Sequence, residues 1–268
     1  IPRQRRDIPL QCCLAKNGVC MFTLAFLCVF AFLAGLIDAA VGGGGLIQIP
    51  ALFNALPQAS VATLFGTNKM SSAVGTVFAA RSYLKRVKIP WRLVLPAAGA
   101  AFVMSFAGAA AVSYIPPSVM RPLVLVLLIV MAIYTFRKKQ LGAVHEPVAI
   151  GRREMLVGLA IGGGIGFYDG LFGPGTGSFL MFLFVRFFAF DFLHASASAK
   201  VVNLATNIAA LCLFIPSGNV LFAYAIPMAV CNVAGALVGS WLAMRKGAGF
   251  VRLLFLVLVT VLICKLAW

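Results

Sequence analysis

Two lysines and two aspartates stand in segments that are otherwise apolar, where charged side chains are rare. Lys69 follows Asp38 by 31 residues, and Lys200 follows Asp169 by the same distance. A charge at mid-depth in a membrane costs about 3 kcal/mol or more, so it marks a functional position by default. We expect the two ammonium groups to bind a small anion. The alternative is a lysine near a helix end whose charge reaches the membrane surface.

A cluster of glycines begins four residues after each aspartate and interrupts an apolar stretch that is too long for one crossing. Irregular backbone is tolerated at membrane depth only where it is buried in protein or lines a cavity. The helix that restarts after each break presents N–H groups and a positive dipole end, which together favour anions. Tight packing between helices is the alternative, because glycine is also common at membrane helix contacts. We favour an anion site built from both breaks.

Polar side chains near each lysine extend this predicted site. Ser72 and Asn203 each follow a lysine by three residues, and Asn207 lies on the same helix face as Lys200. The full set of predicted substrate-binding residues is Gly42, Gly43, Gly44, Gly45, Lys69, Ser72, Gly173, Gly175, Thr176, Gly177, Ser178, Lys200, Asn203 and Asn207.

Asp38 and Asp169 have three readings. Each could pair with a lysine and lower the cost of burying both charges. Each could cap its break by accepting backbone N–H bonds. Either could take up a coupling proton, because desolvation disfavours an ionised carboxyl group. Pairing or capping is favoured over proton coupling.

The elements that position these residues must be membrane helices. The chain has 268 residues, of which 62% are hydrophobic and 10% are charged, and its mean hydropathy is +1.04. The net charge of +16 comes from Lys and Arg in short loops, which is typical of topology signals and not of nucleic-acid binding. No Cys–His spacing suits a metal, no nucleophile–base pair indicates an enzyme, and no cofactor is expected.

A gapless shift of 131 residues superposes the two halves, including the aspartates, the lysines and the glycine breaks. The loop rich in Lys and Arg changes place between the halves, so we predict inverted repeats. An even number of crossings with parallel repeats is the alternative. The predicted fold is an all-α integral membrane protein in which each repeat is a glycine-broken re-entrant hairpin followed by three transmembrane helices. The predicted divisions are an N-terminal tail (1–18), repeat 1 (19–136), a cytoplasmic linker (137–154) and repeat 2 (155–268).

The segments that carry these residues resemble the two signatures of the TauE/SafE family, the sulfite exporter or toluenesulfonate uptake permeases. The first signature corresponds to residues 38–50 and 66–69, and the second to residues 166–178 and 199–203. The resemblance implies a secondary carrier in the bacterial inner membrane for sulfite, sulfoacetate, toluenesulfonate or related compounds. It does not fix the direction of transport or the coupling ion.

The second break departs from the glycine-rich pattern, because Pro174 and Thr176 align with Gly43 and Gly45. The two halves therefore need not bind the substrate symmetrically. We expect a transporter that moves an organosulfonate or sulfite by rocking one half against the other. Thiosulfate or a carboxylate as substrate, or an anion channel, are the alternatives, and coupling to a proton or to sodium stays open.

Overall fold

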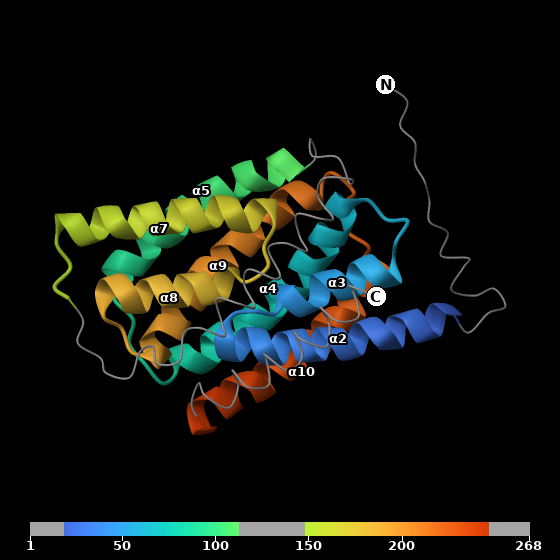
Figure 1. The fold of residues 1–268 in the computed structure, drawn as a ribbon, viewed down its shortest axis with the longest axis horizontal. Coiled ribbons are helices and arrows are strands. Elements are labelled where there is room, and N and C mark those ends of the chain that lie inside the picture. Colours follow the sequence, from blue (N-terminus) through green and yellow to red (C-terminus); the bar gives the residue numbers. More distant parts are fainter. Residues whose placement is uncertain (1–18, 113–147, 247–268) are drawn as a thin grey trace.

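The computed structural model describes residues 19–112 and 148–246, and every regular element in these ranges is an α-helix (Figure 1). The all-α class is therefore confirmed. The predicted tail, most of the linker and the last crossing of each repeat lie outside the described residues. The helices are α2 (Val19–Val41), α3 (Gly45–Ala55), α4 (Val61–Leu84), α5 (Trp91–Val112), α7 (Arg152–Leu171), α8 (Thr176–Phe188), α9 (Phe192–Phe214) and α10 (Phe222–Lys246).

Four of the described helices, α2, α5, α9 and α10, are long and apolar enough to cross a membrane. Helix α4 has 24 residues, which is about 36 Å at 1.5 Å per residue. Its hydropathy is lowered by polar residues such as Asn68, Lys69 and Ser71, and these three side chains are nevertheless little exposed. The chain is thus a multi-pass membrane protein in which these polar residues of α4 are turned inward.

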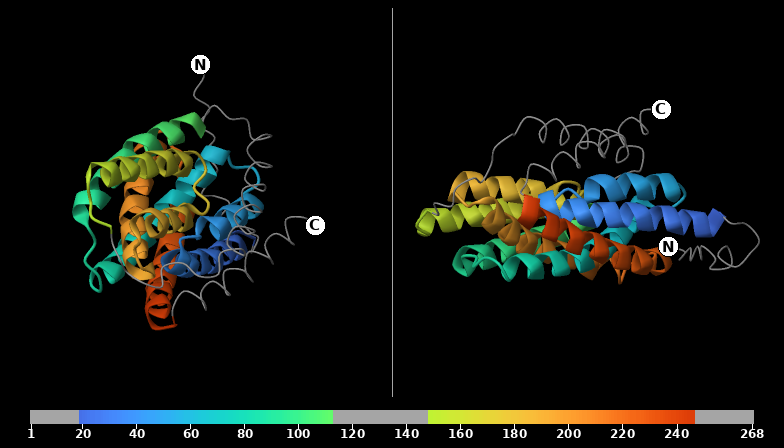
Figure 2. Two further views of the ribbon diagram at one scale, coloured as in Figure 1. Left: turned by 60° about the vertical axis from the view of Figure 1, so that its left-hand side comes forward. Right: turned by 90° about the horizontal axis from the view of Figure 1, so that it is seen from below.

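The two glycine breaks form the tips of two helical hairpins. Helix α3 turns back beside α2 after the first break, and α8 turns back after α7 at the second (Figure 1). The α2–α3 hairpin extends from the middle of the molecule towards one end, and the α7–α8 hairpin extends towards the other end. Helices α3 and α8 therefore lie end to end, with their N-termini facing each other near the centre (Figure 2, right).

The most extensive helix contacts join helices from different halves of the sequence, namely α5 with α7 and α10 with α2. Both contacts depend on a glycine that admits the partner's backbone. A β-carbon on Gly108 would lie 2.2 Å from the carbonyl oxygen of Phe167, and one on Gly239 would lie 2.1 Å from that of Leu36. The 131-residue shift relates these two contacts, so the two halves pack against each other in corresponding ways.

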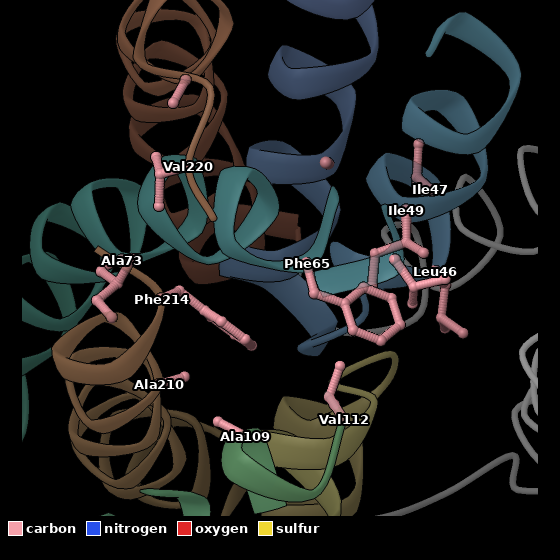
Figure 3. Close-up of a cluster of buried hydrophobic side chains, with 14 of the residues drawn as sticks. Leu46, Ile47, Ile49, Phe65, Ala73, Ala109, Val112, Ala210, Phe214 and Val220 are labelled. Carbon is pink, nitrogen blue, oxygen red and sulfur yellow. The ribbon is translucent and has the colours of Figure 1, made fainter. Parts of the chain in front are cut away.

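Two hydrophobic clusters lie on either side of the polar centre. The first joins α3, α4, α5 and α9, and Figure 3 shows Phe65 and Phe214 within it. The second includes Phe184 and Phe188 of α8 and the first turns of α9. On α9 the second cluster contains Ala195, Ala197, Ala199 and Val202, and the first contains Ala210, Leu211 and Phe214. Asn203 and Asn207 therefore lie between these two apolar layers, and Lys200 lies beside the second.

The charged side chains of the described residues, apart from the four in the apolar stretches, gather at one end of the bundle. They lie where α4, α8 and α10 end and where α5, α7 and α9 begin. Arg86, Leu193 and Arg245 line one pocket, which places three of these helix ends together. The charged residues at this end are Arg81, Lys85, Arg86, Lys88, Arg92, Arg152, Arg153, Glu154, Arg186, Asp191, Arg245 and Lys246.

Candidate functional site

The two glycine breaks touch each other through their backbones. Ser178 donates its N–H to the carbonyl oxygen of Gly42 at 3.0 Å, and its hydroxyl group donates to the carbonyl oxygen of Val41 at 2.6 Å. Gly42 has a φ of +82°, which favours glycine, and a β-carbon there would lie 2.2 Å from the carbonyl carbon of Gly177. The contact requires glycine on both sides, and the two breaks can meet because Gly42 and Gly177 carry no side chain.

Each buried lysine pairs with the aspartate of the other half. Lys69 of α4 donates to Asp169 of α7, and Lys200 of α9 donates to Asp38 of α2 at 2.6 Å. The ammonium group of Lys200 also donates to the backbone carbonyl oxygen of Asp38. The side chain of Lys69 is 4% exposed and that of Lys200 is 3% exposed. The pairs cross between the halves, and the same 131-residue shift converts one into the other.

The second carboxylate oxygen of each aspartate accepts a hydrogen bond from the break in the same half of the chain, and the two bonds differ in length. Asp38 accepts a bond of 3.3 Å from the N–H of Gly44. Asp169 accepts a bond of 2.6 Å from the hydroxyl group of Thr176. Both carboxylates therefore pair with a lysine and cap a break at once. The shorter bond exists because Thr176 stands where the first break has Gly45.

A cavity of about 20 Å³ lies where the breaks and the lysine pairs meet. A cavity of this size holds about one water. A sulfonate group is larger, so the described conformation is more closed than one that binds such an anion. The residues that line it are Asp38, Gly42, Gly45, Asn68, Lys69, Ser72, Asp169, Gly173, Thr176, Gly177, Asn203 and Asn207.

Five of the predicted binding residues do not line this cavity: Gly43, Gly44, Gly175, Ser178 and Lys200. The N–H of Gly44 is taken by Asp38, and both polar groups of Ser178 are taken by the first break. Lys200 is directed at Asp38, which itself lines the cavity.

Asn68 was not among the predicted residues, although it lines the cavity. The signal for it was available, because Asn68 directly precedes Lys69 in the short polar run 66–72 of α4.

Several polar groups at the cavity have no hydrogen-bond partner in the described part of the chain. Asn68 is 5% exposed and Asn207 is 2% exposed, yet the Oδ1 of Asn68 and the Nδ2 of Asn207 are unpaired. The N–H groups of Gly45 and Gly177, at the starts of α3 and α8, also have no recorded partner within the described residues. An unpaired buried polar group costs about 1–3 kcal/mol, so these groups are well suited to a polar guest.

The positive charge at the site is already balanced. Two ammonium groups face two carboxylates, so the four side chains together carry no net charge. The prediction from sequence was that the lysines present their charge to an anion, but in this conformation each lysine faces a carboxylate. Among the described residues, no group of three or more His, Cys, Asp or Glu side chains could hold a metal ion.

Comparisons with known proteins place the sequence in a family. The family model described as "Sulfite exporter TauE/SafE" matches residues 27–266. The chain is 36% identical to the "Probable membrane transporter protein ORF9" of Sinorhizobium sp over 244 residues, which cover 91% of this chain and 92% of the relative. It is 35% identical over 249 residues to "Probable membrane transporter protein YfcA" of Escherichia coli (strain K12), and the match covers 91% of this chain and 90% of the relative.

A third relative, a "Probable membrane transporter protein" of Haemophilus influenzae, is 30% identical over 246 residues, with 91% of this chain and 94% of the relative covered. No solved structure matches the chain. The family is a transporter family and not an enzyme family, and these relatives are named probable membrane transporter proteins. The chain, with its crossed lysine–aspartate pairs between two glycine-broken hairpins, therefore belongs to the TauE/SafE family of membrane transporters.

Proposed function

We propose that the chain is a secondary transporter of the bacterial inner membrane that moves a small sulfur-containing anion such as an organosulfonate or sulfite. The observation that carries this proposal is the pair of crossed lysine–aspartate contacts at the junction of two broken hairpins. Broken segments at corresponding places in two repeats mark the substrate site in many transporters. The family description, which names sulfite export, supports a sulfur anion.

The unpaired groups of the cavity suit a sulfonate or sulfite. Such anions carry several oxygens that accept hydrogen bonds in different directions. The N–H groups of Gly45 and Gly177 and the amide Nδ2 of Asn207 can donate to them. The N-terminal dipoles of α3 and α8 converge on the same place from opposite directions. Lys69 lines the cavity and supplies a full positive charge once the anion competes with Asp169.

An inverted arrangement of the repeats is part of the proposal. Basic residues favour the cytoplasmic side, so we place the charged end of the bundle there. Helix α4 ends at this side, whereas its counterpart α9 begins there. Helix α5 begins there, whereas its counterpart α10 ends there. The two hairpins also enter the bundle from opposite ends (Figure 1). Each of these observations supports inversion over parallel repeats.

The moving bodies in this proposal are not the two halves of the sequence. Rocking one half against the other would separate α5 from α7 and α10 from α2, which are the most extensive contacts of the molecule. We infer instead that α2, α3 and α10 move as one body and that α5, α7 and α8 move as the other. Lys69 of α4 and Lys200 of α9 then connect the two bodies through the crossed pairs.

The experiment is a thermal-shift titration of the purified protein with methanesulfonate, toluenesulfonate, sulfite, thiosulfate and acetate. A ligand that binds the native state raises its melting temperature. We expect sulfonates or sulfite to raise it in the wild type and in Lys88→Ala, whose side chain lies exposed at the basic end. We expect no rise in Lys69→Ala or Lys200→Ala. An equal rise in all four proteins would overturn the proposed site.

The same titration separates the alternative substrates. If only acetate or only thiosulfate raises the melting temperature, the substrate is that anion and not a sulfonate. Uptake into proteoliposomes separates a transporter from a channel, because a transporter with one site saturates at low substrate concentration. Flux that grows without saturation would favour the channel.

A further inference from the structure

The two crossed pairs differ in how firmly their carboxylates are held. The side chain of Asp38 is 17% exposed, whereas that of Asp169 is 2% exposed. Their second oxygens differ too, because Asp38 accepts a long bond of 3.3 Å from Gly44 and Asp169 accepts a bond of 2.6 Å from Thr176. Asp38 is therefore both the more accessible carboxylate and the less constrained one.

The partner of Asp38 keeps its place without the carboxylate. Lys200 donates to the backbone carbonyl oxygen of Asp38 as well as to its side chain. That carbonyl group belongs to the last turn of α2, which is fixed by its packing against α10. Neutralising the carboxylate would thus leave an anchored ammonium group with an unbalanced charge directly behind the cavity wall.

We propose that Asp38 is the proton-binding group of the transport cycle, so that one proton and one substrate anion are bound together. This inference rests on the proposed function. A proton from bulk water binds the Asp38 carboxylate and converts it to a neutral carboxylic acid. The four charges of the site then sum to +1, and a monovalent anion restores neutrality. In a site of low dielectric constant, such a balance strongly favours joint binding.

The neutral acid has a hydrogen-bond acceptor within the same cavity. A protonated carboxyl group carries an O–H that must be paired when it is buried. Asn68 lines the cavity together with Asp38, and its Oδ1 has no partner among the described residues. The unpaired Oδ1 of Asn68 can thus accept a hydrogen bond from the protonated carboxyl group. The unpaired Nδ2 of Asn207 can donate a hydrogen bond to the anion.

The charged and titratable groups around Asp38 are few. Lys200 pairs with it, and Lys69 with Asp169 lies across the cavity. Tyr83 of α4 donates its hydroxyl group to the neighbouring carbonyl oxygen of Ala39. Helix α3 contains no ionisable residue, Arg186 of α8 is exposed near the end of that helix, and Arg245 and Lys246 of α10 are exposed at the basic end.

A sodium ion fits this site less well than a proton. Hard cations require several oxygen ligands at once. The two carboxylates that could supply them are each held by an ammonium group, which would repel the ion. A proton needs only one carboxylate oxygen and adds no bulk to the cavity.

The test is calorimetric binding of methanesulfonate, which stays ionised across the range, between pH 5.5 and 8.5. We expect the wild-type affinity to fall as the pH rises, by up to about tenfold per pH unit, with net proton uptake on binding. Asp38→Asn mimics the protonated state, so its affinity should not vary with pH and its binding should take up no proton. His194→Gln, a titratable position outside the cavity, should keep the wild-type dependence on pH.

The outcomes separate the two proposals. Binding by the wild type that is independent of pH, or that follows the sodium concentration instead, would overturn the role of Asp38 but leave the anion site standing. A pH dependence that persists in Asp38→Asn would do the same. No binding of methanesulfonate, any other sulfonate or sulfite at any pH would instead overturn the proposed function. Proton uptake measured on the wild type keeps the test valid if the variant fails to fold.

Discussion

Gly42 and Gly177 lie backbone to backbone, so closely that a β-carbon on Gly42 would stand 2.2 Å from the carbonyl carbon of Gly177. This contact joins the tips of two hairpins that enter from opposite ends of the molecule. The crossed ion pairs depend on it, because Asp38 and Asp169 each cap the break that this contact fixes.

Substituting Gly42 by alanine should therefore lower stability. The left-handed φ of +82° costs about 1–2 kcal/mol for a residue with a β-carbon, and the clash with Gly177 adds to it. The matched control is Gly99→Ala in α5, where nothing lies within 4 Å of the new methyl group. Thermal unfolding in detergent should show a lower melting temperature for Gly42→Ala alone. Equal melting temperatures would contradict the tight junction.

The Lys69–Asp169 pair should behave as a buried pair in a double-mutant cycle. Lys69→Met and Asp169→Asn each leave one uncompensated buried charge, which costs about 3–5 kcal/mol. The double variant leaves neither charge and should recover much of that stability. Chemical unfolding of the four proteins measures the coupling. Additive losses would mean that the two side chains do not interact, and the crossed arrangement would be wrong.

Asn207→Leu should separate stability from binding. The Nδ2 of Asn207 is buried without a partner, so an apolar side chain of similar size should leave stability unchanged or raise it by about 1–3 kcal/mol. Sulfonate affinity should nevertheless fall about tenfold or more, because a donor to the anion is lost. Thermal unfolding with and without toluenesulfonate gives both values. Loss of stability with intact affinity would assign Asn207 to packing.

The inverted arrangement predicts opposite labelling of two corresponding loops. Ser217, between α9 and α10, and Lys88, between α4 and α5, are exposed positions in loops that the 131-residue shift superposes. Each is changed to cysteine in a background without the seven native cysteines. A membrane-impermeant maleimide should label Ser217→Cys in intact cells and label Lys88→Cys only after permeabilisation. Labelling of both from the same side would indicate parallel repeats.

Much of the framework could be predicted because its signals are local. The helices that carry the lysines, Val61–Leu84 and Phe192–Phe214, follow the two breaks in corresponding positions, as the repeat in the sequence indicates. Both breaks were visible as glycine clusters in apolar stretches. The chain contains only six acidic residues, so the superposition of Asp38 on Asp169 was informative.

The pairing across the halves could not be predicted, because spacing within one half says nothing about which lysine an aspartate meets. The residue types at Gly44 and Ser178 suit an anion, but their groups are taken by the protein itself. Such competition depends on distances that the sequence does not contain. The contacts of α10 with α2 and α5 with α7 are of the same long-range kind.

The central claim is that the junction of the two breaks binds a sulfonate beside the crossed pairs. A crystal structure with 4-bromobenzenesulfonate tests it directly, because the anomalous signal of bromine locates the ligand. We predict one bromine peak whose sulfonate group lies among Gly45, Gly177 and Lys69, in a cavity wider than the present one, with at least one lysine–aspartate contact opened. A ligand bound only at the basic end of the bundle, with both pairs intact, would contradict the account.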